Sequence, residues 1–406
     1  MSRHPALRHH RIIDGELHLG GHPVRHWVAQ HGTPLYLYDG RLITERVAAL
    51  RSALPDGISL HYAVKANPMP ELVKLLATLV DGMDVASADE LERALATGLA
   101  DTDISFAGPG KRDEELVLAL QSGVLLVVES EGELGRLLRI ADQLGKTPPI
   151  ALRINPAFRL RASGMHMGGG PSPFGIDEER IPTLLREIAT LPVDLMGFHV
   201  FAGSQNLSAE YLIAAQTAIF ERIQRLLPDF PGELRWLNIG GGLGIPYFPG
   251  ERPLELAPLA EALATHQEML RRLAPNCELV MELGRYLVGE AGVYVARIVD
   301  RKQSRGKVYL VTDGGMHQHL AASGNLGQVL RRNYPVIAPE YMDRPAEEKV
   351  TIVGPLCTPL DVLATDIEMP RLQVGDLVAV LQSGAYGYSA SPLGFLGHPP
   401  PVERLL

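Results

Sequence analysis

The chain has few cysteines, no long hydrophobic run and no excess of positive charge. Its 406 residues include two cysteines, Cys277 and Cys357, so we expect no disulfide framework. No apolar stretch reaches the roughly 18 residues of a membrane-spanning helix, and residues 1–11 lack the apolar core of a signal peptide. A net charge of −9 without a basic run argues against a nucleic acid or an anionic membrane as partner. We therefore expect a soluble, cytoplasmic protein.

From residue 58 onward, short apolar segments alternate with amphipathic segments. Eight segments have strand character and the seven between them have helical periodicity. This alternation predicts a (β/α)₈ TIM-like barrel, with a doubly wound open sheet as the alternative. The expected strands are 58–64, 80–86, 104–107, 124–128, 150–154, 195–201, 236–239 and 279–282. The expected helices are 69–79, 88–97, 112–122, 131–144, 177–190, 208–227 and 257–274.

After residue 284 the pattern changes to β-type segments separated by glycine- and proline-rich turns. We expect one further helix at about 316–331, and we interpret residues 11–28 as short β segments that join this second domain. The predicted fold is thus α/β, with a barrel at 36–285 and a mostly β domain formed by 1–35 and 286–406. The later β-type segments are 290–300, 307–312, 349–353 and 376–382.

The first predicted barrel strand ends in a lysine, Lys65. Lysine is seldom buried, so Lys65 either extends its amine to solvent at the rim or forms a Schiff base in a partly desolvated site. In a barrel, functional groups gather at the carboxyl ends of the strands. The residues at these ends are Lys65, Asp84, Arg153, His199, Gly240-Gly241-Gly242 and Glu282-Leu283-Gly284-Arg285.

These strand ends suit an anionic, heteroaromatic cofactor. The glycines at 240–242 can aim backbone N–H groups at a phosphate, with Arg285 beyond the eighth strand and Ser204 adding a hydroxyl. Glu282 ends an apolar strand, and a buried acid needs a partner such as a protonated pyridine nitrogen. His199 could stack on a ring. A glycine-rich turn or a core histidine is ordinary when it stands alone, but the combination indicates pyridoxal 5'-phosphate.

Further motifs lie in order along almost the whole chain. They are Tyr62-Ala63-Val64-Lys65-Ala66-Asn67, His199 with Gly203-Ser204-Gln205, Gly240-Gly241-Gly242, Glu282-Leu283-Gly284-Arg285, Gly354-Pro355-Leu356-Cys357 with Asp361, and Gly384-Ala385-Tyr386-Gly387. With them the chain resembles the fold-type III pyridoxal-phosphate decarboxylases, which have the alanine-racemase-like fold and include diaminopimelate and ornithine decarboxylases. Through residues 106–111 and 164–170 it is most similar to the exosortase-A-associated pyridoxal-dependent decarboxylases.

The resemblance implies a role for each matching residue. Lys65 would carry the cofactor as a Schiff base (aldimine), His199 would stack on the ring, and Glu282 would bind the pyridine nitrogen. Asp84 and Arg153 would support the region of Lys65. The phosphate would be bound by Ser204, Gly240, Gly241, Gly242, Gly284 and Arg285, with Tyr386 near it.

The resemblance also implies a head-to-tail homodimer with shared active sites. Cys357 of the partner subunit would reprotonate the carbanion that decarboxylation leaves. Thr358, Asp361 and Arg285 would contact the substrate. We expect no metal.

Three departures from the family pattern concern the substrate. Thr358 replaces the usual acidic residue after the cysteine, and Ala321 stands where diaminopimelate decarboxylases have an arginine. The tail at 391–398 lacks the usual asparagine and arginine. We therefore predict an amino-acid α-decarboxylase whose substrate is a free amino acid or an aminoacyl group on a carrier protein, with meso-diaminopimelate as the alternative. A racemase would pair the ring nitrogen with arginine, and pyridoxal-phosphate homeostasis proteins lack the second domain.

Overall fold

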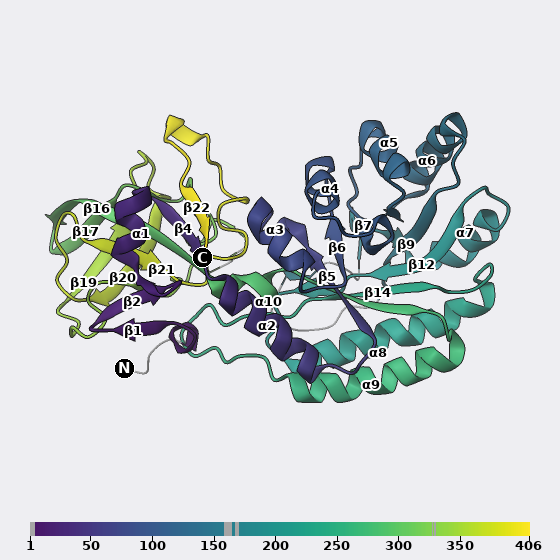
Figure 1. The fold of residues 1–406 in the computed structure, drawn as a ribbon, viewed down its shortest axis with the longest axis horizontal. Coiled ribbons are helices and arrows are strands. Elements are labelled where there is room, and N and C mark those ends of the chain that lie inside the picture. The colour runs from purple at the N-terminus through teal and green to yellow at the C-terminus, as the bar shows by residue number, and fades with distance from the viewer. Residues whose placement is uncertain (1–4, 158–164, 167–169, 327, 329) are drawn as a thin grey trace. The chain divides into compact units, whose positions relative to one another are not determined.

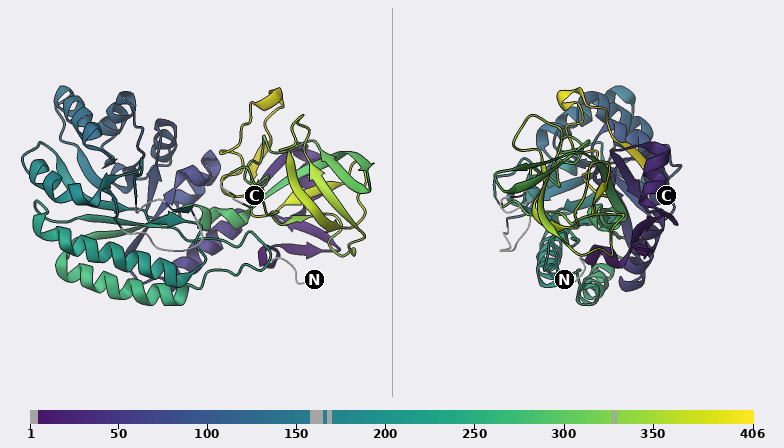
Figure 2. Two further views of the ribbon diagram at one scale, coloured as in Figure 1. Left: turned by 180° about the vertical axis from the view of Figure 1, so that it is seen from behind. Right: turned by 90° about the vertical axis from the view of Figure 1, so that its left-hand side faces the viewer.

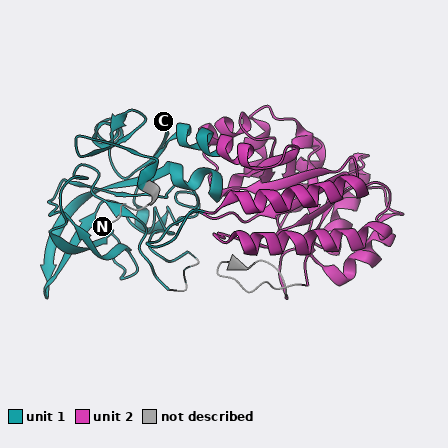
Figure 3. Ribbon diagram, turned by 90° about the horizontal axis from the view of Figure 1, so that it is seen from below, with its two compact units in different colours: residues 1–46, 245–253, 285–406 teal, residues 47–244, 254–284 magenta. Residues whose placement is uncertain are grey.

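The computed structural model describes residues 5–157, 165–166, 170–326, 328 and 330–406. The chain forms two compact units (Figure 3). The barrel unit consists of residues 47–244 and 254–284, and the β unit consists of residues 1–46, 245–253 and 285–406. Among the described residues, no helix is both long and apolar enough to cross a membrane.

The barrel unit contains eight parallel strands that close on themselves. The ring closes because the last strand pairs with the first and the fourth pairs with the fifth. The predicted barrel is therefore confirmed, and the alternative of an open doubly wound sheet is excluded. Its strands are β5 (Ile58–Ala63), β6 (Gly82–Val85), β7 (Ile104–Phe106), β8 (Leu125–Val128), β9 (Pro149–Asn155), β12 (Asp194–Val200), β14 (Trp236–Gly241) and β15 (Glu278–Leu283).

Helices connect these strands on the outside of the barrel, and α8 runs beside α9 (Figures 1 and 2). Ser87, Ser130 and Ser208 cap three of them, each accepting a hydrogen bond from the backbone N–H three residues later. The helices are α3 (Pro70–Ala77), α4 (Ala88–Leu95), α5 (Asp113–Ser122), α6 (Glu131–Leu144), α7 (Ile181–Ile188), α8 (Ala209–Leu226) and α9 (Leu256–Leu273), while α2 (Gly40–Ala53) has residues in both units. Three short strands, β10 (Met165–His166), β11 (Ile176–Asp177) and β13 (Gly203–Ser204), lie outside the ring.

The β unit is built on the long strand β16 (Gly292–Ser304), which pairs with β4, β17 and β21. The other strands of this sheet are β4 (Leu35–Tyr38), β17 (Lys307–Thr312), β18 (Val336–Ile337), β19 (Glu348–Val353), β20 (Val362–Met369), β21 (Leu377–Val380) and β22 (Val402–Leu405). A separate sheet contains β1 (Arg11–Ile13), β2 (Glu16–Leu19) and β3 (His22–Pro23), and the unit also has the helices α1 (Val24–His31) and α10 (Arg285–Val288). Short 3₁₀ turns lie at Pro5–Arg8, Val64–Ala66, Asp101–Asp103, Glu178–Arg180, Leu227–Asp229, Gly289–Ala291 and Phe395–Gly397.

Two local predictions in the β unit are wrong. Part of the expected β segment 11–28 is the helix α1, which follows Pro23, buries Val24 and Val28, and ends at Gly32 with φ +78°. The helix expected at about 316–331 does not form in the described part of that segment, where nearly all of residues 316–326 are in turns. Side chains there take up backbone groups that a helix would use: Ala322 N–H donates to His319 Nδ1, and Leu320 N–H donates to Ser391 Oγ.

Candidate active site

Three predicted site residues meet at the carboxyl ends of barrel strands. Lys65 follows β5, and its Nζ donates to Glu282 Oε1 at 3.0 Å. His199 in β12 has its Nε2 3.1 Å from the second carboxylate oxygen, Oε2. The Glu282 side chain is 4% exposed and that of Lys65 is 47% exposed. A buried carboxylate thus lies between a buried imidazole and an amine that solvent can reach.

The partners of Glu282 decide its charge. Burial raises the pKa of this carboxyl, but the positive charge of Lys65 and the hydrogen bond from His199 outweigh burial and leave the pKa below its usual value. Glu282 is therefore ionised at neutral pH. A fixed negative charge with little access to water can hold a cation or a protonated ring nitrogen.

The backbone of the predicted phosphate loop, residues 240–242, packs closely against the backbone of the segment with Gly203 and Ser204. Gly240 and Gly242 have φ of +66° and +77°, where side chains are strained. A Cβ on Gly242 would lie 2.7 Å from the carbonyl oxygen of Gly203, so the loop could not approach the half-buried Ser204 segment with a larger residue. The N–H of Asn206 donates to the carbonyl of Gly242 at 2.9 Å. The structure thus brings residues 240–242 next to Ser204, as the phosphate prediction requires.

Gly284 allows another close approach at the end of β15. A Cβ on Gly284 would lie 2.7 Å from the Cβ of Ala66, the residue after Lys65. Glycine at 284 therefore allows the end of β15, which contains Glu282, to approach the turn that contains Lys65. Gly241 pairs in register with Glu282, so the glycine loop is also tied to β15.

Asp84 and Arg153, predicted to support Lys65, each have an acid–base partner of their own. Asp84 accepts a hydrogen bond from Ser105 Oγ and lies 3.8 Å from His61 Nδ1. Arg153 Nη1 donates to Glu129 Oε1 at 2.7 Å, and both side chains are buried. Their support for Lys65 remains a prediction.

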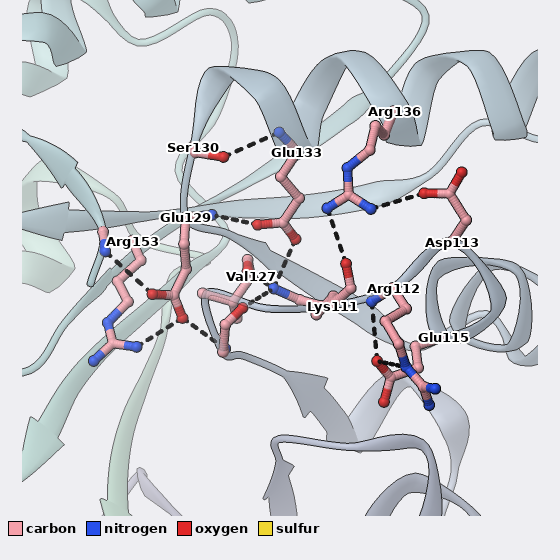
Figure 4. Close-up of polar contacts among 12 residues, drawn as sticks. Lys111, Arg112, Asp113, Glu115, Val127, Glu129, Ser130, Glu133, Arg136 and Arg153 are labelled. Atoms are coloured by element: carbon pink, nitrogen blue, oxygen red, sulfur yellow. Dashed lines mark hydrogen bonds and ion pairs between the residues drawn. The ribbon is translucent and has the colours of Figure 1, made fainter. Parts of the chain in front are cut away.

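Glu129 belongs to a network of buried charges that the sequence analysis missed (Figure 4). It accepts hydrogen bonds from the N–H groups of Gly108 and Gly175 as well as from Arg153. Lys111, also buried, lies with its Nζ 2.6 Å from Glu133 Oε1. The sequence does contain a signal for Glu129. It directly follows the predicted strand 124–128, just as the other candidate residues lie at the ends of their predicted strands. Through Glu129, which follows β8, this network joins Gly108, Arg153 and Gly175.

Within the β unit, Arg285 lies among tyrosines. Its Nη1 donates to the Tyr247 hydroxyl at 2.8 Å, and its guanidinium lies 4.6 Å from the centre of the Tyr386 ring. The rings of Tyr247 and Tyr334 are 4.7 Å apart. The predicted pair Arg285 and Tyr386 is thus brought together, while Tyr247 and Tyr334 come from segments without a recognisable motif.

The turn with Cys357 is held by Asp361. This residue is 2% exposed; its Oδ1 accepts from the N–H of Met316 at 2.6 Å and its Oδ2 from the N–H of Leu356 at 2.8 Å. Burial raises the pKa of Asp361. Cys357 is exposed, and Thr358 is half-buried. Asp361 therefore joins two turns of the β unit, and its predicted contact with substrate remains a prediction.

Comparison with known proteins places these features in context. Residues 41–289 match the family model described as "Pyridoxal-dependent decarboxylase, pyridoxal binding domain". An L-glutamyl-[BtrI acyl-carrier protein] decarboxylase of Niallia circulans is 39% identical, over 92% of this chain and 88% of the relative. A diaminopimelate decarboxylase of Aquifex aeolicus is 35% identical, over 93% of this chain and 88% of the relative. The solved structure of a diaminopimelate decarboxylase from M. jannaschi has a TM-score of 0.88 at 26% identity, covering 98% of this chain and 93% of that one.

Proposed function

The chain belongs to the pyridoxal-dependent decarboxylases, and from this premise we propose that Lys65 binds the cofactor and that the substrate is an amino acid tethered to a carrier protein. Membership of the family confirms the predicted cofactor, pyridoxal 5'-phosphate, and the predicted class of enzyme, an amino-acid decarboxylase. The particular residues, the form of the substrate and the assembly are our proposals.

The described residues fit this cofactor. Its aldehyde needs an amine, and Lys65 Nζ lies at the barrel mouth 3.0 Å from Glu282. Its pyridine nitrogen needs an acid that stays ionised, as Glu282 does. Its phosphate needs backbone N–H groups in a loop without side chains, as at 240–242. When bound, the cofactor supplies an electron sink for the pair that departing CO₂ leaves behind.

The protein's own groups would then have separate tasks. Glu282, held by His199 on its buried side, would keep a proton on the pyridine nitrogen. Ser204 would add a donor to the phosphate, and a role of Arg285 in phosphate binding remains a prediction. The exposed thiol of Cys357 would give a proton to the substrate carbon in the site of the other subunit of a homodimer. The observation that carries this proposal is the arrangement of Lys65, Glu282 and His199.

The tethered substrate is proposed from the β unit. Thr358 and Ala321 have no charge at the positions where diamine and diaminopimelate decarboxylases have charged residues, so a charged distal group would find no partner there. A thioester at the distal side-chain carboxyl leaves the α-carboxylate free to depart as CO₂, and it presents an uncharged carbonyl where other substrates have a distal carboxylate or ammonium. The name of the Niallia circulans relative describes such a substrate.

Meso-diaminopimelate is the second candidate, because relatives named for that reaction match nearly the whole chain. To decide, holoenzyme is incubated separately with L-glutamyl-loaded carrier protein, free L-glutamate and meso-diaminopimelate, and products are identified by mass spectrometry. We expect loss of CO₂ from the carrier-bound group, and none with Lys65→Ala. Turnover of meso-diaminopimelate alone would overturn the tethered substrate. The domain limits, the cytoplasmic location and the absence of nucleic-acid or membrane partners remain predictions.

A further inference from the structure

A groove of about 590 Å³ runs along one face of the β-unit sheet, over β16, β17, β19 and β20. Figure 1 labels these four strands. Strand register places its lining residues in rows across the sheet. Ser304 lies opposite Lys307 at one end. Val311 lies beside Val353, which is opposite Val362, at the other. Four residues of strand separate Lys307 from Val311, or ~13 Å along the groove.

The chemistry of the lining changes along this length. Two exposed lysines line the first two rows: Lys307 lies in the first row, and Lys302 lies in the second. The second row also has two hydroxyls, since Lys302 lies opposite Tyr309, which lies beside Thr351. The valines follow, and then the turn with Leu356 and Thr358. The groove thus has positive charge and hydroxyls in its first two rows, becomes apolar after them, and ends next to Cys357.

We propose that this groove binds the 4'-phosphopantetheine arm of a carrier protein, with the phosphate at Lys302 and Lys307 and the thioester at Thr358. The order of groups in such an arm, phosphate then amides then thioester, follows the order of the lining. The proposal rests on the carrier-bound substrate argued above and adds the path by which it reaches the turn with Cys357.

Charges near the groove are compatible with a phosphate. Lys307 lies 3.7 Å from Asp366, but both side chains are more than half exposed, so this ion pair is weak and can be replaced. Asp361 also lines the groove, at the opposite end, and two backbone N–H groups hold its carboxylate. The chain has a net charge of −9, so these two lysines form a local positive patch on a negatively charged protein. Such a patch attracts a negatively charged group.

The test uses charge reversal in the holoenzyme. Lys302→Glu and Lys307→Glu each reverse a groove charge, and Arg371→Glu reverses an exposed charge outside the groove as the matched control. Activity is measured with L-glutamyl-loaded carrier protein and with L-glutamyl-pantetheine thioester, which lacks the phosphate. Calorimetry measures binding of free 4'-phosphopantetheine, and sedimentation measures the oligomeric state.

We expect KM for the carrier substrate and Kd for 4'-phosphopantetheine to rise about tenfold in both groove variants. Their kcat and their KM for the pantetheine thioester should not change. Arg371→Glu should have the wild-type value of each constant. Equal KM in wild type and groove variants, or no binding of 4'-phosphopantetheine to wild type, overturns the groove while leaving a carrier-bound substrate possible. If wild type turns over only free amino acids, the proposed function fails, and the binding measurement still decides the groove. Dissociation of an oligomer by Lys302→Glu would assign the groove to a second copy instead and overturn the proposal.

Discussion

Replacing Glu282 by glutamine removes a charge at the centre of the proposed cofactor site and keeps its size. The carboxylate is 4% exposed and has partners at 3.0 and 3.1 Å, so water cannot take over the role of the lost charge. Loss of a single preorganised group of this kind costs about 10²–10³ in kcat, or ~3–4 kcal/mol. Because the glycine loop and Ser204 are untouched, we expect the variant to keep most of its cofactor.

The assay measures CO₂ release together with the cofactor content of the purified protein. Glu131→Gln is the matched control, since Glu131 lies on α6 with a 47% exposed side chain that pairs with Arg180. The control should have wild-type kcat. A Glu282→Gln enzyme with full cofactor and a kcat within a few-fold of wild type would show that Glu282 is a structural acid only. Complete loss of cofactor would place its main effect in binding rather than in the chemical step.

The same substitution predicts a pH effect on the stability of the apo-protein. The folded-state pKa of Glu282 lies below the usual 4.5, so its ionised form stabilises the fold above pH 4.5, and this contribution is lost as the pH falls through the folded-state value. The difference in thermal midpoint between wild type and Glu282→Gln should therefore be larger at pH 7 than at acidic pH. A difference that grows on acidification would contradict the assigned ionisation.

Three other predictions can be tested directly. Borohydride reduction of the holoenzyme should leave a pyridoxyl adduct on the Lys65 peptide, and an adduct on another lysine would refute that site. Co-expression of Lys65→Ala with Cys357→Ala should restore roughly a quarter of wild-type activity, since half of randomly mixed dimers contain one intact shared site; inactive single variants without rescue would refute sharing. Burial lowers the pKa of His319 to about 3. Its Nδ1 accepts from Ala322 N–H, and its Nε2 lies 2.8 Å from Ser383 Oγ. Wild type should lose about 2 kcal/mol of stability between pH 6.5 and about pH 5 from this residue, and His319→Gln should lose less; identical pH profiles of unfolding would contradict this.

The barrel was predictable because buried parallel strands are apolar along their whole length. The segment expected at 58–64 is β5, Ile58–Ala63, and the one at 279–282 lies within β15, Glu278–Leu283. The meeting of Lys65, His199 and Glu282 followed from the same topology, since a closed barrel brings its strand ends to one mouth. No distance was needed for that inference, only the position of each residue at the end of its strand.

The features that were missed depend on contacts between distant segments. Glu129 binds Arg153, 24 residues later, and also the N–H of Gly175, 46 residues later, so no local pattern reports the network. Tyr247 lies in a loop without periodicity and is recognised only by its bond to Arg285. A helix was expected at about 316–331, but hydrogen bonds from backbone N–H groups to His319 and Ser391 compete with helix formation there. Single-residue propensities do not contain that competition.

The division of the chain into units explains how chemistry and specificity can change separately. Lys65, His199, Glu282 and the glycines at 240–242 all belong to the barrel unit. Thr358, Ala321 and the tail at 391–398, which depart from the family pattern, all belong to the β unit. Lys65 and His199, the two partners of Glu282 described above, come from the barrel unit, so these departures lie outside that arrangement. With the roles proposed above, the β unit can change substrate while the barrel unit retains the proposed cofactor residues.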